Sequence, residues 1–376
     1  MKKFINKKNT LIIVLQYFLC AFTLQAASVN HELEVSLGKL IFEDKTLSQP
    51  VGQSCASCHA PSQGDAQQGM IVSPGATPTL FGNRNAPSIT YSMFTTPWYF
   101  NTEDETWIGG FFLDGRAKTM HEQAKGPFLN PLEMGNTSAH QVVSKVQLAA
   151  YQSMFEKVYG KEIWSKPEAA FNAVATALVA YQKSDSFAPR FTSKYDAYLQ
   201  NKTTLTAQEM RGLKLFEAED KGNCAACHPS QIGEKGELPL FTDFSYDNLG
   251  VPKQSHLPFY AMSKKINPTG KNYVDVGLAE NPNIKDAQAQ LGKFKVPTLR
   301  NIAKTAPYMH NGVFLTLKES VDFYNTRDVD QKWAKAEVST NVNKDELGDL
   351  KLTKDEVDDL VSFLHTLDDG FVGKSS

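Results

Sequence analysis

Two short segments of the chain combine cysteine and histidine in the same order and spacing. Each contains two cysteines three positions apart and a histidine directly after the second: Cys55, Cys58 and His59 in GQSCASCHAP, and Cys224, Cys227 and His228 in GNCAACHPS. On the first turn of a helix, two such thiols can each form a thioether with a vinyl group of one haem, and the histidine then lies under the iron. The pattern predicts two covalently attached c-type haems, with His59 and His228 as their proximal ligands.

Zinc binding and a redox-active disulfide are the other chemistries that cysteines at this spacing allow. A structural zinc ion needs four ligands, the two segments are far apart in the sequence, and zinc would leave a histidine unexplained. A CxxC disulfide needs no following histidine, yet the histidine occurs in both segments. We therefore expect haem attachment at both.

Two haems leave two further axial positions, and these positions decide what each haem does. A histidine or methionine there makes an electron-transfer haem, whereas an empty position lets the iron bind peroxide. The axial ligand also sets the reduction potential, because methionine raises it and an anionic oxygen ligand such as tyrosinate is expected to lower it.

The N-terminus predicts export. Lysines are followed by an apolar run from Leu11 to Leu24 and by small residues, so residues 1–27 are typical of a cleavable secretory signal, and we expect a periplasmic protein. Cleavage would remove Cys20 and leave only the four cysteines of the two motifs, so no structural disulfides are expected. No later segment is apolar over the roughly 18 residues that a membrane span needs.

The composition and length of the chain argue against some classes of partner and suggest the number of domains. The formal net charge of −2 gives no electrostatic signature of binding to nucleic acid or to an anionic membrane. A mature chain of about 350 residues favours two domains.

An internal repeat divides the chain. The helical segment before each motif contains a glycine and then a phenylalanine, Gly38 with Phe42 and Gly212 with Phe216. Each half also ends in an amphipathic helix: residues 167–184, with Phe171, Val174, Leu178 and Tyr181 on one face, and residues 353–367, with Val357, Leu360, Val361 and Leu364 on one face and a capping box of Thr353 and Glu356. We predict a mostly α fold of two cytochrome c-like domains, residues 28–195 and 196–376.

Long segments of little periodicity lie between these helices. Residues 60–100 and 229–297 are rich in Gly, Pro, Asn and Ser. Loops of this length are unusual in compact domains. A large apolar prosthetic group resolves the difficulty, because the loops can pack on the haem.

Beyond the two CxxCH motifs, three further segments resemble the bacterial dihaem cytochrome c peroxidases and their MauG-type relatives. They are RNAPS (84–88), LDGRAKTMHEQAKGPFLNPLEMG (113–135) and FKVPTLRNIAKTAPYMHNGVFLTLKESVDFYN (294–325), and the resemblance covers roughly residues 30–370. It implies that the N-terminal haem reacts with hydrogen peroxide. It also implies that electrons arrive through the C-terminal haem from a small cytochrome c or cupredoxin.

The resemblance assigns roles around the peroxide site. Glu133, in the family pattern NPxEM, is implied to be the acid-base residue, and Gln123 and Pro127 are implied to line the pocket. The chemistry agrees, because heterolysis of a peroxide needs a proton moved from the near oxygen to the far one, and a carboxyl group in a dry pocket can move it.

The chain departs from the classical peroxidases in two places. Residues 72–87 contain no histidine where those enzymes hold a displaceable ligand of the N-terminal iron, so we expect an open iron, as in MauG-type enzymes. Leu113 stands where the family usually has a tryptophan between the haems, which puts fast charge sharing between them in doubt. Phe111 and Phe112 are poor substitutes, and Trp107 could serve only if its loop folds inward.

The resemblance also implies the remaining ligands. Tyr324 is the implied distal ligand of the C-terminal haem, with Met309 as its rival, and His310 is expected to be structural or near a propionate. A calcium ion between the haems is implied at Asn85, Thr305 and Pro307, and oxygen-only ligation suits Ca²⁺.

The sequence therefore predicts a periplasmic dihaem peroxidase that reduces hydrogen peroxide to water. Two alternatives stay open: a MauG-type oxidase that uses peroxide to oxidise aromatic residues of a partner protein, and a dihaem electron carrier without turnover. The carrier predicts two six-coordinate irons and no use for Glu133.

Overall fold

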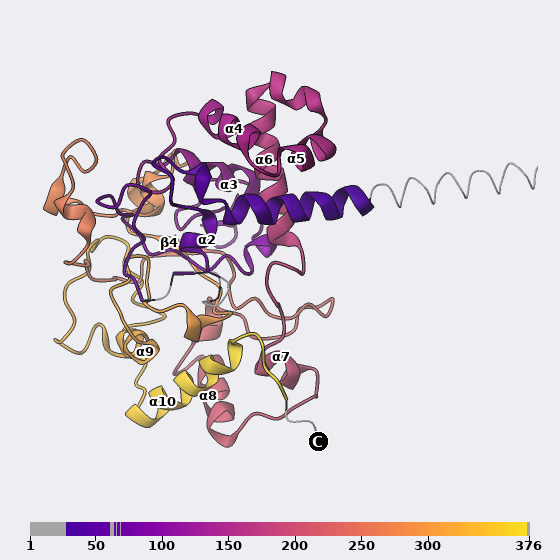
Figure 1. The fold of residues 1–376 in the computed structure, drawn as a ribbon. Helices are drawn as coiled ribbons and strands as arrows, with labels where there is room; N and C mark the ends of the chain where they lie inside the picture. Colours follow the sequence, from indigo (N-terminus) through magenta and orange to yellow (C-terminus); the bar gives the residue numbers. More distant parts are fainter. Residues whose placement is uncertain (1–27, 61–63, 65, 68, 374–376) are drawn as a thin grey trace, which may run out of the picture.

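A computed structural model describes residues 28–60, 64, 66–67 and 69–373, and the predicted signal segment, residues 1–27, lies outside this part of the chain. The described part is mostly helical, as predicted. Its longer helices form two groups at opposite ends of the molecule, with α2 and β4 between them (Figure 1). None of the described helices is both long and apolar enough to cross a bilayer.

The N-terminal group is built around α6. It contains a first helix over residues 28–43 and then α3 (Met120–Leu129), α4 (Ala139–Leu148), α5 (Gln152–Tyr159) and α6 (Pro167–Lys183). Helices α3 and α4 both pack against α6, which is buried along most of its length. The predicted apolar face of this helix is buried: Phe171, Val174, Leu178 and Tyr181.

The C-terminal group contains α7 (Lys194–Leu199), α8 (Ala207–Glu217), α9 (Leu317–Thr326) and α10 (Lys354–Leu364). Helix α10 packs against α8 and α9. The predicted capping box is present, because Thr353 and Glu356 each accept a hydrogen bond from the other's backbone N–H. Of the predicted apolar face, Val357, Leu360 and Leu364 are buried and Val361 is partly exposed.

The repeated glycine marks the point where each pre-motif helix crosses its partner helix. A Cβ atom on Gly38 would lie 2.0 Å from the carbonyl oxygen of Ala177 in α6. A Cβ atom on Gly212 of α8 would lie 2.1 Å from the carbonyl oxygen of Asp359 in α10. Because any larger residue would separate the helices, the sequence repeat corresponds to a repeated close helix crossing.

The remaining elements are short. The described single-turn helices are α2 (Cys55–Cys58), η1 (Lys45–Leu47), η3 (Ser92–Phe94), η4 (Lys161–Ser165), η5 (Cys224–Ala226), η6 (Pro258–Ala261), η7 (Gly270–Asn272), η8 (Leu278–Glu280), η9 (Gln288–Gln290), η10 (Ile302–Lys304) and η11 (His365–Leu367). Two antiparallel pairs join β1 (Tyr99–Asn101) to β2 (Thr106–Ile108) and β3 (Tyr246–Asp247) to β4 (Phe294–Lys295). The two long loops predicted from composition thus have little regular structure.

Two large apolar clusters form the cores. The first joins buried residues between Leu37 and Ala188, and the second joins buried residues between Tyr195 and Leu367. Next to the second cluster, the fully buried Arg300 places Nη1 2.6 Å from Oδ2 of Asp196 in α7. The domain limits at 195 and 196 remain a prediction.

Candidate functional site

One large cavity lies between the two groups of helices, and both CxxCH motifs open onto it. It has a volume of about 660 Å³ and is lined by residues of both halves of the chain. Most of the predicted site residues line it: Cys58, His59, Asn85, Leu113, Gln123, Pro127, Glu133, Cys224, Cys227, His228, Thr305, Pro307, Met309 and Tyr324. Cys55 is not among the lining residues and packs against the N-terminal core.

The four motif cysteines are free thiols. Burial raises the pKa of Cys55, Cys224 and Cys227 to about 12, and it also raises the pKa of Cys58. A thiol with a raised pKa tends to stay protonated, so burial disfavours the thiolate form that binds a metal ion. The described residues contain no cluster of three or more His, Cys, Asp and Glu side chains that could hold a metal ion.

Local structure orients the motif histidines. His59 follows the single turn α2, and its backbone N–H donates to Cys55 O at 3.0 Å. Nδ1 of His228 lies 2.8 Å from the carbonyl oxygen of Phe241, which assigns the proton to Nδ1 and leaves the Nε2 lone pair for a metal. Burial lowers the pKa of His228 and favours the neutral imidazole that binds iron.

Glu133 follows α3, the helix that carries Gln123 and Pro127. Oε1 of Glu133 accepts a hydrogen bond of 2.6 Å from Nδ2 of Asn130. Burial raises the pKa of the Glu133 carboxyl above its ordinary value of 4.5, while Asn130 and the positive charge of Arg116 oppose the rise. Because its pKa is raised, this carboxyl binds a proton more readily than an exposed glutamate does.

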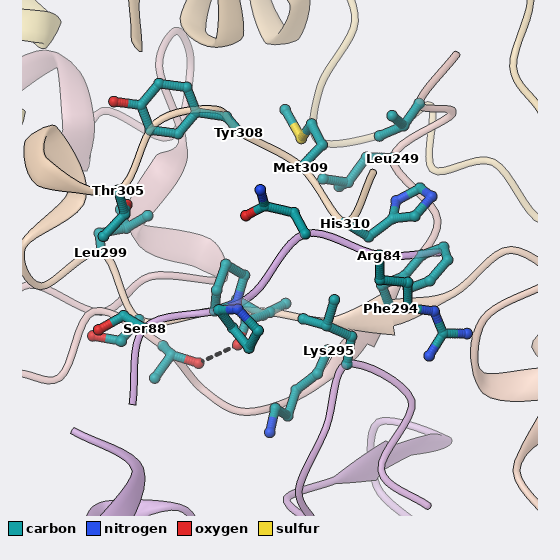
Figure 2. Close-up of a pocket in the computed structure, with 18 of the residues that line it drawn as sticks. Arg84, Ser88, Leu249, Phe294, Lys295, Leu299, Thr305, Tyr308, Met309 and His310 are labelled. Atoms are coloured by element: carbon teal, nitrogen blue, oxygen red, sulfur yellow. Dashed lines mark hydrogen bonds between the residues drawn. The ribbon is translucent and has the colours of Figure 1, made fainter. Parts of the chain in front are cut away.

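None of the histidines that line the cavity in the described part of the chain belongs to the loop of residues 72–87. Those among the described lining residues are His59, His228 and His310. His310 stacks on Phe294, with ring centroids 3.7 Å apart, and Figure 2 shows it near that ring and Arg84. Burial lowers the pKa of His310 to about 4, and its buried Nε2 has no hydrogen-bond partner among the described residues.

Tyr324 and Met309 both line the cavity, so its outline alone does not choose between them as a haem ligand. Tyr324 lies on α9, and its hydroxyl has no hydrogen-bond partner within the described part of the chain. Burial raises the pKa of Tyr324, and the nearby Cys227 and Cys224 add to the rise. A half-buried phenol without a hydrogen-bond partner among the described residues, near the second motif, is available to coordinate a cation there.

The wall between the two motifs contains Leu113 and both phenylalanines before it, Phe111 and Phe112. Trp107 is not a lining residue, and it stacks on Trp98 instead. Among the described residues, no tryptophan therefore lines the cavity.

The three predicted calcium ligands, Asn85, Thr305 and Pro307, all line the cavity. Nδ2 of Asn85 donates to the carbonyl oxygens of Met70 and Ile71, at 3.2 and 3.0 Å, so its Oδ1 points elsewhere. Figure 2 shows Thr305 among the residues that line the cavity, near Leu299. The calcium ion remains a prediction.

Two basic residues of the cavity were not assigned a role from the sequence, although each lies in a quoted motif. Arg84 is neutralised by ion pairs to Asp275, at 2.6 Å, and Asp114, at 2.5 Å. Lys295 donates to Gly110 O at 2.6 Å, and burial lowers its pKa to about 8. Lys295 could pair with a haem propionate, because that carboxylate would offset the cost of its buried charge.

Comparison with known proteins identifies the family. A sequence model described as di-haem cytochrome c peroxidase matches residues 32–204, and one described as cytochrome c matches residues 209–368. The methylamine utilization protein MauG of Paracoccus denitrificans (strain Pd 1222) is 36% identical over 367 residues, which cover 93% of this chain and 92% of that protein. The chain belongs to the di-haem cytochrome c peroxidase/MauG family.

Other similar proteins include both peroxidases and a MauG-like protein. The cytochrome c551 peroxidase of Nitrosomonas europaea is 30% identical, over 81% of this chain and 76% of that one. The crystal structure of the diheme peroxidase BthA from Burkholderia thailandensis E264 superposes with a TM-score of 0.81 at 36% identity, covering 89% of this chain and 86% of that one. A MauG-like protein associated with microbial copper homeostasis gives a TM-score of 0.67 at 29% identity, with 90% of each chain covered.

These relatives confirm the predicted resemblance and the fold of two cytochrome c-like domains. The protein is an oxidoreductase of the peroxidase type in a family that carries two haems. Both peroxidases and MauG proteins are among its relatives, so membership alone does not choose between their reactions.

Proposed function

We propose that this di-haem protein is a peroxidase that reduces hydrogen peroxide to water with electrons from a small redox protein. The observation that carries the proposal is that Glu133 and His59 line the same cavity. The carboxyl has a raised pKa, and the loop of residues 72–87 contributes no histidine to the wall. A proton-carrying group beside an open axial position is what peroxide reduction requires and what a simple electron carrier lacks.

The cysteine pairs would attach the haems. Cys55 and Cys58 would attach the N-terminal haem, Cys224 and Cys227 would attach the C-terminal haem, and His59, His228 and Tyr324 would bind the irons. When bound, the haems supply the redox chemistry. Two observations support this assignment: the neutral imidazole of His228, with its proton on Nδ1, and the Tyr324 hydroxyl, which has no hydrogen-bond partner among the described residues.

Glu133 would move the proton that O–O cleavage needs. As carboxylate, it would take the proton from one oxygen of the bound peroxide. As carboxylic acid, it would return that proton to the other oxygen, which leaves as water when the O–O bond breaks, and the bound haem would supply the two electrons. Gln123 would orient peroxide by hydrogen bonding, and Pro127, which has no N–H, would close the pocket without adding a donor.

Electrons would enter at the C-terminal half, where a small cytochrome c or cupredoxin docks near the edge of that haem. The predicted signal segment supports a periplasmic location, where such donors would be met. Asn85, Thr305 and Pro307 would hold a calcium ion between the two haem sites, through one side-chain oxygen and two backbone carbonyls.

A MauG-type reaction is the second candidate, in which the electrons come from aromatic residues of a partner protein. Tyr324 and the open pocket favour it. Leu113 weighs against it, because leucine cannot be oxidised to pass charge between the haems.

The test is steady-state turnover of the holoprotein with peroxide and a reduced small cytochrome c. The peroxidase oxidises two molecules of cytochrome for each peroxide consumed. Peroxide consumption that leaves the cytochrome reduced would favour the MauG-type reaction. An absence of peroxide consumption under every condition would leave only the electron carrier.

A further inference from the structure

A column of aromatic rings runs from the cavity wall to the surface. Trp98 and Trp107 stack with ring centroids 4.6 Å apart and planes at 10°. Phe100 packs edge-on against Trp107 at 5.2 Å, because these two residues are paired across strands β1 and β2. At the outer end of the column, Phe100 is 41% exposed and Tyr99 is 49% exposed.

The inner end of the column rests on the turn that lines the cavity. A Cβ atom on Gly110 would lie 2.9 Å from the Trp98 ring, and one on Gly115 would lie 2.4 Å from it. Two glycines with positive φ therefore let the indole lie directly on this main chain. Leu113 and Asp114, in the same turn, line the cavity, so a single layer of backbone separates Trp98 from it.

We propose that Trp98 and Trp107 form a relay that carries oxidising equivalents from the cavity to the surface, where Trp107 oxidises small phenols. The relay rests on the proposed function, because peroxide reduction supplies the oxidising equivalents. Each peroxide takes up two electrons and two protons to give two waters. Two phenols each lose one electron and one proton to become phenoxyl radicals, and each indole passes on every electron that it receives.

The surroundings of the pair favour loss of an electron. Stacking shares the positive charge of an oxidised indole between two rings. The turn that joins β1 and β2 adds three exposed acidic residues, Glu103, Asp104 and Glu105, whose negative charge stabilises a nearby cation. Neither indole N–H has a hydrogen-bond partner among the described residues, and both side chains are half-buried, so water can take up a proton there.

The other two tryptophans of the chain provide matched controls, because all four are half-buried. Trp333 lies under the Lys332 ammonium, whose Nζ is 4.6 Å from the ring, and this cation opposes loss of an electron. Trp164 stacks on Phe155 beside the N-terminal core, and neither of these control tryptophans lines the cavity. Exposure alone would therefore oxidise all four tryptophans alike, whereas a relay would oxidise one pair.

The exposed rings of Tyr99 and Phe100 suit a flat aromatic reductant. A phenol can stack on such rings without a deep pocket, at the edge of Trp107. The relay would thus give the enzyme a second place for electrons to enter, separate from the C-terminal docking surface for a protein donor.

The first experiment maps oxidation within the protein. The holoprotein is given peroxide without any reductant, and mass spectrometry of its peptides locates added oxygen on the tryptophans. The relay predicts oxidation at Trp98 and Trp107 and little at Trp164 or Trp333. Equal oxidation of all four would overturn the relay.

The second experiment measures peroxide-dependent oxidation of guaiacol, a small phenol, and of a reduced small cytochrome c. Trp107→Phe keeps an aromatic ring but is hard to oxidise, so guaiacol oxidation should fall at least about tenfold relative to cytochrome oxidation. Trp107→Tyr, which can be oxidised, should restore part of the loss, and this rescue separates a redox role from a packing role. Trp164→Phe is the control.

The outcomes separate the two proposals. Guaiacol oxidation that is equal in the wild type and Trp107→Phe would overturn the relay and leave the peroxidase intact. A holoprotein that consumes no peroxide with either reductant would overturn the proposed function and the relay with it.

Discussion

Glu133→Gln is the substitution that isolates the proposed proton transfer. The glutamine side chain has nearly the same shape, and its amide oxygen can still accept the hydrogen bond that Asn130 donates to Oε1 at 2.6 Å. The pocket should therefore keep its shape and its haem. The variant loses only the group that can take up and return a proton.

The expected loss follows from what general acid-base catalysis contributes. A positioned acid-base residue accelerates a reaction by about 10²- to 10⁴-fold, so kcat/KM for peroxide should fall by about 10²-fold or more, or roughly 3 kcal/mol of barrier. Glu156→Gln, which changes a carboxylate bonded to Trp164 in the N-terminal group, is the matched control and should keep full activity.

The pH profile provides a second readout of the same residue. Burial raises the pKa of Glu133 above 4.5, and the step that takes the proton from peroxide needs the carboxylate. Activity should therefore be lost as the pH falls through this raised pKa. Asn130→Ala removes a donor that stabilises the carboxylate, so it should move the acidic limb to higher pH.

The assay measures peroxide-dependent oxidation of a reduced small cytochrome c as the pH is lowered from neutral through the acidic limb. The ferric absorption spectrum is recorded for each variant. An unchanged kcat/KM in Glu133→Gln, with a normal spectrum, would remove Glu133 from the mechanism. An acidic limb that persists in that variant would assign the titration to another group.

Three further predictions concern ligands and stability. Tyr324→Phe should change the low-spin signal of the C-terminal haem and Met309→Leu should not; the reverse would make Met309 the ligand. Asp196→Asn leaves the fully buried guanidinium of Arg300 without its charged partner. Chemical denaturation should therefore show a free energy of unfolding that is lower by about 3–5 kcal/mol. Lys318→Ala, which removes an exposed ion pair, should lower the free energy of unfolding by less than about 1 kcal/mol. Equal losses in the two variants would show that burial of the Arg300–Asp196 pair does not matter. Metal analysis should find one calcium per chain, lost in Asn85→Ala; a wild type without calcium would end that assignment.

Local patterns predicted much of the fold. The helical face of Phe171 and Tyr181 and the capping box of Thr353 are encoded within a few residues, and the structure contains both. The repeated glycines at positions 38 and 212 were visible in the sequence. Their role at two helix crossings became clear only when the partner helices were placed.

Features that join distant segments could not be predicted in this way. Arg84 pairs with Asp275, and the stacking of Trp98 on Trp107 depends on a hairpin whose short strands give no periodic signal. The sequence could not choose between Tyr324 and Met309 as the ligand of the C-terminal haem iron for a different reason. Both side chains line the cavity, so the choice depends on which ligand the iron prefers.

The proposed peroxidase needs two haems, one of which has a vacant axial position. Electron paramagnetic resonance of the ferric holoprotein, before and after addition of azide, tests this directly. We expect one high-spin and one low-spin haem, with only the high-spin signal changed by azide. Two low-spin signals, both unaffected by azide, would contradict it.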